Sequence, residues 1–265
     1  MIVVVGQPVL RNLGDRVVAV GSAARIATAA AAGGSTVQLV GKVGEDPDGD
    51  VLVLALAAAG VGHVAVLRDP SRRTPRLVAP ARDAGDAADA VRAGDAAGAG
   101  RAAGAGDVVR AGDATGAGRA AEVGDAADGV LGEALDGEAE PARIEPADAA
   151  DLPSLDSADI DLGLRYLTEF SVLVVAVPVD DAVGSIVSAA AGWASATLIV
   201  LVEDGAAAPT GLPPDAIVLQ APPPDPDGTF DILVGDLAAS IDRGVPARDA
   251  FRELLAAAGW EPADA

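Results

Sequence analysis

The amino-acid sequence predicts an α/β protein, built as a three-layer α/β/α sandwich around a mostly parallel sheet. Short runs of β-branched and aliphatic residues alternate along the chain with alanine-rich stretches of helical length. The run at residues 171–177 is almost entirely apolar, which is typical of a strand buried on both faces. Strands and helices that alternate in this way favour a parallel sheet covered by helices on both sides.

The individual elements follow from local signals. The apolar run at residues 2–5 ends at Gly6, as a strand does before a turn. Ser22 is a suitable N-cap for a helix that two glycines stop after residue 32. Pro246 suits the first turn of the last helix. We therefore expect strands at residues 2–5, 36–40, 63–67, 171–177, 197–202 and 216–219, and helices at 22–32, 48–59, 180–191, 231–242 and 246–258.

Composition and charge exclude several classes of function. The 265 residues carry 18 Lys and Arg against 40 Asp and Glu, a net charge of −22, which repels nucleic acid and anionic membranes. The chain has no cysteine and one histidine, so we predict no disulfide, no thiol nucleophile and no metal site. No apolar stretch approaches the roughly 18 residues of a membrane span, and no basic flank suggests a secretion signal. We therefore expect a cytoplasmic protein.

One segment differs from the rest of the chain. Residues 82–151 consist almost wholly of Ala, Gly, Asp, Glu and Arg, with 6 arginines against 16 acidic residues. Within it, residues 92–109 and 110–127 match at 13 of 18 positions. Two glycine-rich copies bury too little apolar surface to form a solenoid. We therefore expect one domain over residues 1–265, interrupted at 82–151 by an acidic, low-complexity insertion.

Two motifs carry a family resemblance. Residues 40–61 read VGKVGEDPDGDVLVLALAAAGV, and residues 225–244 read DPDGTFDILVGDLAASIDRG. Together they resemble the ribokinase/PfkB family of carbohydrate and nucleoside kinases. The matching positions are Gly41, Gly44, Asp46, Gly49, Leu56, Gly60 and Val61 in the first motif, and Asp225, Gly228, Asp231, Gly235 and Gly244 in the second.

The resemblance implies a ribokinase-like fold and transfer of the γ-phosphate of ATP to a sugar or nucleoside hydroxyl, with ATP and Mg²⁺ as cofactors. In that family, backbone N–H groups at a glycine-containing turn and helix start bind the transferred phosphate. The last aspartate of the second motif takes the proton of the acceptor hydroxyl. Carried over to this chain, Asp231 is the catalytic base, and Gly228, Thr229 and Phe230 form the anion hole.

Four departures from the family pattern favour a second interpretation. Phe230 stands where the family has a second glycine, and its Cβ would restrict a positive φ. Arg11 and Arg25 replace the Asp and Asn that bind the sugar. Asn12 is the only asparagine, so the family's Asn-x-x-Glu element, which organises magnesium, is absent. Only nine residues separate Arg11 from Gly21, where the family usually carries a β-strand lid, so we expect a reduced or absent lid.

Two hypotheses about function therefore stay open. The chain is an ATP-dependent carbohydrate kinase, or it is a catalytically inactive pseudokinase that needs no cofactor and acts as a binding or interaction protein. In either case Arg11, Arg25 and Asp46 are the expected residues of the substrate pocket, and the ligand is a sugar-like or anionic small molecule. The alternative roles are structural: Asp231 stabilises the start of its helix, and each arginine pairs with a nearby acid. The sequence leaves the oligomeric state of the protein open.

Overall fold

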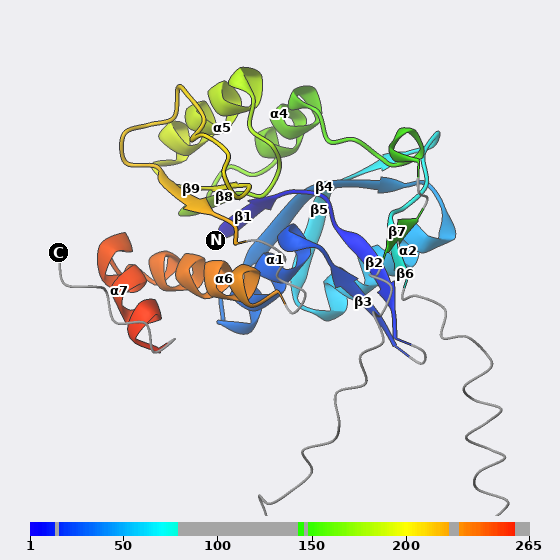
Figure 1. The fold of residues 1–265 in the computed structure, drawn as a ribbon, viewed down its shortest axis with the longest axis horizontal. Coiled ribbons are helices and arrows are strands. Elements are labelled where there is room, and N and C mark those ends of the chain that lie inside the picture. Colours follow the sequence, from blue (N-terminus) through cyan, green and yellow to red (C-terminus); the bar gives the residue numbers. More distant parts are fainter. Residues whose placement is uncertain (14–15, 79–142, 146–147, 223–227, 258–265) are drawn as a thin grey trace, which may run out of the picture. The chain divides into compact units, whose positions relative to one another are not determined.

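The computed structural model describes residues 1–13, 16–78, 143–145, 148–222 and 228–257. Its centre is a six-stranded sheet in the order β10-β9-β8-β1-β4-β5, and every pair of neighbouring strands is parallel (Figure 1). These strands are β1 (Ile2–Val5), β4 (Val37–Gly44), β5 (Val61–Asp69), β8 (Val172–Val175), β9 (Thr197–Val202) and β10 (Ile217–Gln220). The chain builds β4 and β5 on one side of β1 and later β8 to β10 on the other, so the strand order reverses beside β1.

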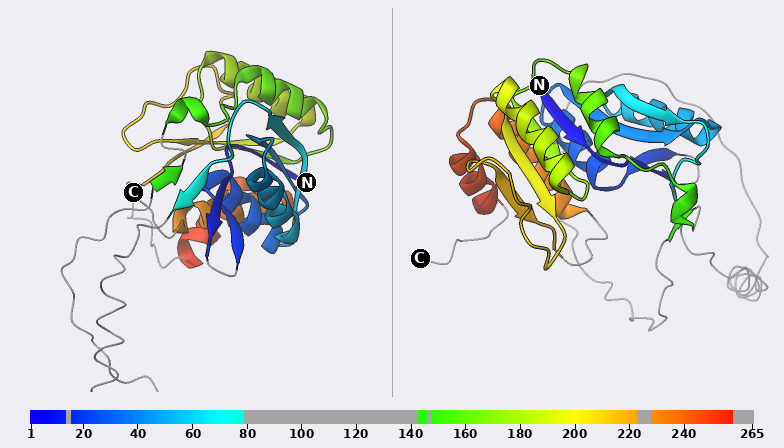
Figure 2. Two further views of the ribbon diagram at one scale, coloured as in Figure 1. Left: turned by 90° about the vertical axis from the view of Figure 1, so that its right-hand side faces the viewer. Right: turned by 90° about the horizontal axis from the view of Figure 1, so that it is seen from above.

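Helices cover both faces of this sheet (Figure 2). One face carries α1 (Ser22–Ala32), α2 (Pro47–Ala58), α6 (Thr229–Asp242) and α7 (Ala247–Ala257), and the other carries α4 (Ser157–Arg165) and α5 (Asp181–Ala194). The central strand β1 is buried on both sides, because Ile2 and Val4 pack in one apolar cluster and Val3 and Val5 in the other. The predicted three-layer sandwich is confirmed.

A second, smaller sheet has four short strands in the order β3-β2-β6-β7. They are β2 (Val9–Asn12), β3 (Val17–Val20), β6 (Arg76–Val78) and β7 (Arg143–Glu145). Leu10 of this sheet packs with Val43 of β4 and Leu52 of α2, which fixes the sheet to the main body. Of the two expectations for the lid, reduced or absent, the structure has the reduced form, with strands of three or four residues.

The observed elements differ from the predicted ones in a few places. Gly21, with φ 87°, is the N-cap of α1, so Ser22 is the first helical residue and the prediction of Ser22 as the cap is wrong. Strand β4 continues to Gly44 because its end pairs with β5 as far as Asp69. Helix α4 was not predicted; it begins with reciprocal capping bonds between Asp156 and Asp159 and buries Ile160 and Leu164.

The predicted insertion at residues 82–151 falls mostly on 79–142, which lie outside the described residues. Its end is described: Arg143–Glu145 forms β7, antiparallel to β6, and Ala149–Asp151 forms the short 3₁₀ helix η1. The predicted insertion, which was defined by composition alone, therefore includes β7, a strand of the second sheet. Over the part of the chain that the structure covers, no helix is both long and apolar enough to span a bilayer.

Candidate functional site

A cavity of about 280 Å³ lies between the second sheet and the start of α6. Val9, Val20, Leu77 and Ile144, one from each strand of the second sheet, form its apolar wall. The facing wall comes from α1, from the start of α6 and from the residues that follow β10. Among the described residues that line it, only Arg25 and Asp231 carry a charge.

The turn before α6 requires a glycine. Gly228 is the N-cap of α6 and has φ 70° and ψ 28°, the left-handed conformation that glycine adopts without strain. A Cβ added at Gly228 would also overlap the guanidinium of Arg25, so the Arg25 side chain lies directly against the Gly228 backbone. The sequence prediction therefore placed Gly228 correctly at a glycine-dependent turn, and the structure adds a cation in contact with it.

Asp231 lies in the first turn of α6 and is 6% exposed. Its Oδ2 atom is 3.8 Å from Nη1 of Arg25, which comes from α1. A carboxylate in this position is stabilised by the helix dipole and by the neighbouring guanidinium. The structure therefore brings together two of the predicted site residues, one acidic and one basic, at one end of the cavity.

Phe230 does not have the positive φ that the resemblance of the second motif led us to expect at this position. It is the second residue of α6, and Ser195 is the only non-glycine residue with a positive φ in the described ranges, so Phe230 carries no such strain. Its ring packs against the apolar cluster between the sheet and α1 and also lines the cavity. The expected conflict between a side chain and a positive φ at position 230 is therefore wrong, because Gly228 takes that conformation instead.

Arg11 lies on the cavity side of the second sheet. It is two residues from Val9 on β2, so both side chains are on the same face. Its partner across the ladder to β6 is Leu77, which lines the cavity as Val9 does. Arg11 lies two residues beyond Val9 along β2, and its side chain is partly exposed. Arg11 is not among the described residues that line the cavity, so its predicted place in the substrate pocket stays a prediction.

A second cavity of about 430 Å³ adjoins the first at the carboxyl ends of β8, β9 and β10. The two cavities share Ser22 and Ala221 in their linings. Its wall is largely aliphatic, and Glu203 is the charged residue among the described lining residues. The carboxyl ends of parallel strands, next to the point where strand order reverses, are the usual ligand position in such sheets. The two adjoining cavities therefore form a two-part site, with Arg25 and Asp231 in the first part and Glu203 in the second.

Comparison with known proteins supports the fold. No protein-family model and no curated protein sequence matches this chain. Among solved structures, Arabidopsis thaliana ribokinase complexed with ribose and ATP aligns with a TM-score of 0.54 and 14% identity, covering 97% of this chain and 90% of that one. A putative ribokinase II from E. coli aligns with a TM-score of 0.53 and 11% identity, covering 96% and 90%.

The fold is ribokinase-like. The structural neighbours include fructokinases as well: one from Xylella fastidiosa, crystallised with ATP, aligns with a TM-score of 0.40 and 15% identity. That alignment covers 96% of this chain but only 65% of the fructokinase. At such identities the shared property is the arrangement of helices and strands, and the chemistry has to be argued from this chain's own residues.

In this ribokinase-like fold, Asp46 lies apart from Arg25 and Asp231. It is the N-cap of α2, and its Oδ1 accepts hydrogen bonds from the Gly49 N–H at 2.7 Å and from the Thr74 hydroxyl at 2.7 Å. Its Oδ2 accepts from the Thr74 N–H at 2.9 Å. Burial raises the pKa of Asp46, but these hydrogen bonds and the charge of Arg68 outweigh it and hold the pKa below its ordinary value. Asp46 therefore holds together local backbone, and the structure does not bring it to the cavity of Asp231.

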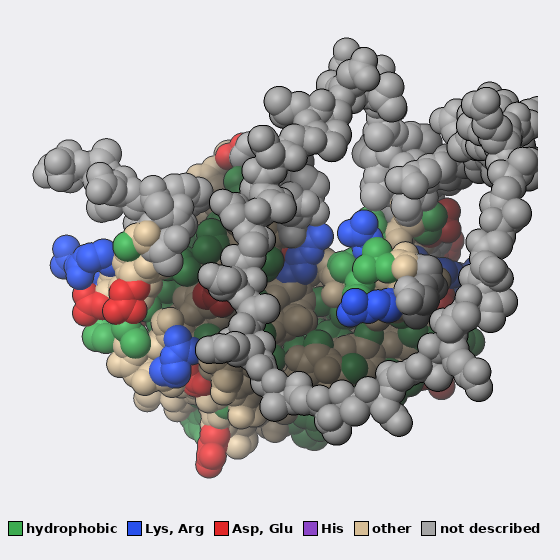
Figure 3. Space-filling view, turned by 90° about the horizontal axis from the view of Figure 1, so that it is seen from below, with side chains coloured by type: hydrophobic (Ala, Val, Ile, Leu, Met, Phe, Trp, Pro, Cys, Tyr) green, Lys and Arg blue, Asp and Glu red, His purple; other side chains and the backbone are tan. Residues whose placement is uncertain are grey.

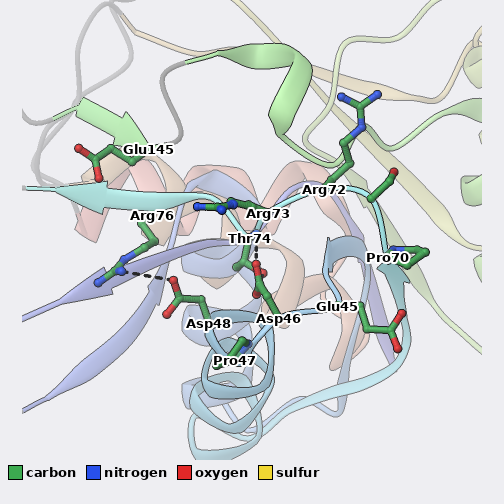
Figure 4. Close-up of a pocket in the computed structure, with 11 residues that line it drawn as sticks. Glu45, Asp46, Pro47, Asp48, Pro70, Arg72, Arg73, Thr74, Arg76 and Glu145 are labelled. Carbon is green, nitrogen blue, oxygen red and sulfur yellow. Dashed lines mark hydrogen bonds and ion pairs between the residues drawn. The ribbon is translucent and has the colours of Figure 1, made fainter.

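Asp46 instead lines a different, open cavity of about 980 Å³ (Figure 4). The close-up shows Arg76 directed toward Asp48, with Nη1 3.3 Å from Oδ2, while Arg72 points away from both. Arg72, Arg73 and Arg76 are all exposed. Basic and acidic side chains are mixed here, so this cavity has no single sign of charge.

The sequence analysis missed the contribution of the second sheet to the site. Short apolar runs at 9–10 and 17–20, on either side of the turn-forming pair Gly14-Asp15, are a β-hairpin signal that could have revealed β2 and β3. The strand β7 had no such signal, because it follows a compositionally biased segment. Within the ranges that the structure covers, no three His, Cys, Asp or Glu side chains gather into a metal-binding group.

Proposed function

We propose that this chain is a ribokinase/PfkB-type carbohydrate kinase that transfers the γ-phosphoryl group of ATP to a hydroxyl of a sugar or nucleoside. The observation that carries the proposal is the position of Asp231: a nearly buried carboxylate next to the left-handed turn at Gly228, at the start of a helix that faces a cavity. The ribokinase-like fold and the two sequence motifs support it. A cytoplasmic location is part of the proposal, because the reaction consumes ATP, and nucleic acid and membranes are not expected partners.

The reaction assigns one role to each part of the site. The Asp231 carboxylate accepts the proton of the acceptor hydroxyl as that oxygen bonds to the γ-phosphorus. The bond between the γ-phosphorus and its bridging oxygen breaks, and ADP leaves. The backbone N–H groups of Thr229 and Phe230 belong to the first turn of α6, and the positive end of this helix would stabilise the negative charge that develops on the phosphoryl group.

The adjoining cavity suits the nucleotide. Its aliphatic wall at the ends of β8 to β10 can accept a flat base, and it joins the Asp231 cavity at Ser22 and Ala221. When Mg²⁺ is bound with ATP, it neutralises charge on the phosphates, and in such sites phosphates and waters supply most of its ligands. Among the described residues of the two cavities, Asp231 and Glu203 are the carboxylates, and either could supply one ligand to a metal whose other ligands come from the nucleotide and water.

One observation favours the inactive alternative. The Arg25 guanidinium lies against Gly228 and pairs with Asp231, in the region where the kinase reaction needs an incoming phosphate and a carboxylate able to accept a proton. If Arg25 keeps this position when ligands are bound, the cavity binds a small molecule without phosphoryl transfer. The two functions therefore differ in whether the protein turns over ATP, and in the kinase that turnover depends on Asp231.

The test is ATP-dependent phosphorylation of a panel of sugars, sugar acids and nucleosides, together with thermal stabilisation by ATP with and without Mg²⁺. We expect turnover in the wild type, and a loss of about 100-fold or more in Asp231→Asn. Asp236→Asn is the matched control, because Asp236 is an exposed carboxylate on the same helix. Stabilisation by ATP without turnover would support the inactive alternative, and no effect of ATP in either assay would overturn the kinase proposal.

A further inference from the structure

We propose that the molecule bound beside Asp231 carries a negatively charged group, a carboxylate or a phosphate, and that Arg25 selects it. The inference rests on the proposed function, because it takes the Asp231 cavity as the acceptor site. It goes further by naming the class of acceptor: a hydroxylated anion the size of a monosaccharide rather than a neutral sugar.

The charge balance of the cavity is the first argument. The chain has a net charge of −22, and among the described residues that line this cavity Arg25 is the one cation and Asp231 the one carboxylate. Figure 3 shows that this face of the molecule carries both Lys or Arg and Asp or Glu side chains. On such an acidic protein, Arg25 is therefore the group of the described lining that favours a small anion.

The second argument is the chemistry of Arg25. A guanidinium donates hydrogen bonds and accepts none, and its planar fork matches the paired oxygens of a carboxylate or phosphate. A neutral sugar has hydroxyl groups that both donate and accept hydrogen bonds. An arginine can donate to these hydroxyl oxygens, but it cannot accept a hydrogen bond from them. Arg25 is therefore better matched to an anion than to a sugar hydroxyl.

The surroundings of Arg25 strengthen this preference. Its side chain is 22% exposed, and the opposite wall of the cavity is formed by Val9, Val20, Leu77 and Ile144. Charges interact more strongly beside an apolar wall than in water, and the loss of hydration of Arg25 is better offset by an anion than by a neutral group. The cavity volume of about 280 Å³ restricts the ligand to a small molecule.

The position of Arg25 also explains how an anionic acceptor can bind close to Asp231. A second negative charge next to that carboxylate is unfavourable unless a cation lies beside both. Nη1 of Arg25 is 3.8 Å from Oδ2 of Asp231, so one guanidinium serves both negative groups. A hydroxyl near Asp231 and an anionic group near Arg25 would then lie within a few bonds of each other in the same ligand.

The experiment compares ligands that differ in charge but not in carbon skeleton. Binding of gluconate is measured against sorbitol, and of glucose 6-phosphate against glucose, by calorimetry or thermal shift on the full chain. We expect at least one anionic member to bind about tenfold or more tightly than its neutral partner. The pair that shows the larger ratio distinguishes a carboxylate from a phosphate ligand. The ratio should fall at about 1 M NaCl, where charge interactions are screened.

Variants assign the preference to Arg25. Arg25→Gln should bring the ratio close to one, and Arg25→Lys, which keeps the charge without the fork, should give an intermediate value. Arg165→Gln is the control, since Arg165 is an exposed arginine of α4 on the other face of the sheet, and it should leave the ratio unchanged. Circular dichroism shows whether each variant is folded. If Arg25→Gln does not fold, the comparison is made with Arg25→Lys alone.

The outcomes separate this inference from the kinase proposal. An anion preference that depends on Arg25 but comes without ATP turnover would support the inference and overturn the kinase proposal. Turnover of neutral sugars with equal binding of both members of each pair would do the reverse. If no anionic probe binds, or if the preference survives in both Arg25 variants, the inference is wrong.

Discussion

The Thr74 hydroxyl donates a hydrogen bond to Oδ1 of Asp46 at 2.7 Å and accepts one from the Gly44 N–H at 3.0 Å (Figure 4). Thr74 is 2% exposed, and the Arg68 guanidinium donates to the Gly44 carbonyl at 3.2 Å. This pair of residues joins the end of β4, the start of α2 and the segment that leads into β6. It explains why the glycine- and aspartate-rich turn of the first sequence motif needs its residue types.

Replacing Thr74 tests the energy of this junction. Thr74→Val keeps the shape of the side chain but leaves the Gly44 N–H and Asp46 without their hydroxyl partner. Leaving buried polar groups unpaired costs about 1–3 kcal/mol each, so we expect a loss of about 2 kcal/mol or more in the free energy of unfolding. Urea denaturation measures it. Thr74→Ser retains the hydroxyl and should lose clearly less; equal losses for the two variants would contradict this role.

Asp46 makes folding sensitive to acid. Its pKa is lower in the folded chain than its ordinary value, because the hydrogen bonds from Thr74 and Gly49 outweigh burial. The stability it contributes is therefore present above the unfolded pKa of about 4 and is lost as the pH falls through the lower folded pKa. Asp46→Asn should be less stable than the wild type at about pH 7 and approach it at about pH 3, as followed by urea denaturation. A difference that does not change with pH would contradict this assignment.

The sequence predicted the main sheet well for a physical reason. Its central strands β1 and β8 are buried on both faces, and runs such as residues 197–202 contain almost only large apolar side chains, so these strands need no partner to be recognised. The second sheet could not be predicted in the same way. Its strands have three or four residues, and one of them, β6, pairs with strands from segments far apart in the sequence. Tertiary pairing of this kind leaves little local signal.

The site, too, could be predicted only where its residues leave a local signal in the sequence. Motif matching brought Gly228 and Asp231 together, because a helix that begins at a left-handed turn favours a glycine there and an acidic residue in its first turn. It also grouped Asp46 with them, although Asp46 serves its own helix. Contact between Arg25 and Gly228 depends on how closely α1 and α6 approach, and small residues on both helices set that distance. No periodicity within either helix reveals it.

Gly235 permits the close approach of α1 and α6. A Cβ at Gly235 would lie 2.6 Å from the Ile26 carbonyl oxygen and 2.6 Å from the Ala29 Cβ. Because one of these atoms belongs to the backbone, a change of rotamer cannot relieve the contact. We expect Gly235→Ala to destabilise the protein by about 1–3 kcal/mol, measured by chemical denaturation.

Gly192 provides the matched control for that substitution. It also lies within a helix, α5, but it is exposed, and a Cβ there meets no atom within 4 Å. Gly192→Ala should therefore stabilise the protein by about 0.5–1 kcal/mol through helix propensity alone. If both substitutions shift stability in the same direction, the close packing of α1 on α6 is not what selects glycine at position 235.

Gly228 and Arg25 should be energetically coupled. Gly228→Ala places a Cβ at φ 70°, which costs about 1–2 kcal/mol, and it also displaces the Arg25 guanidinium that lies against this position. In an Arg25→Ala background the second cost disappears and only the backbone strain is left. The loss caused by Gly228→Ala should therefore be smaller in that background, by about 0.5 kcal/mol or more in a double-mutant cycle measured by chemical denaturation. An equal loss in both backgrounds would mean that Arg25 is free to leave Gly228 at no cost, and that its contact there contributes nothing to the stability of the site.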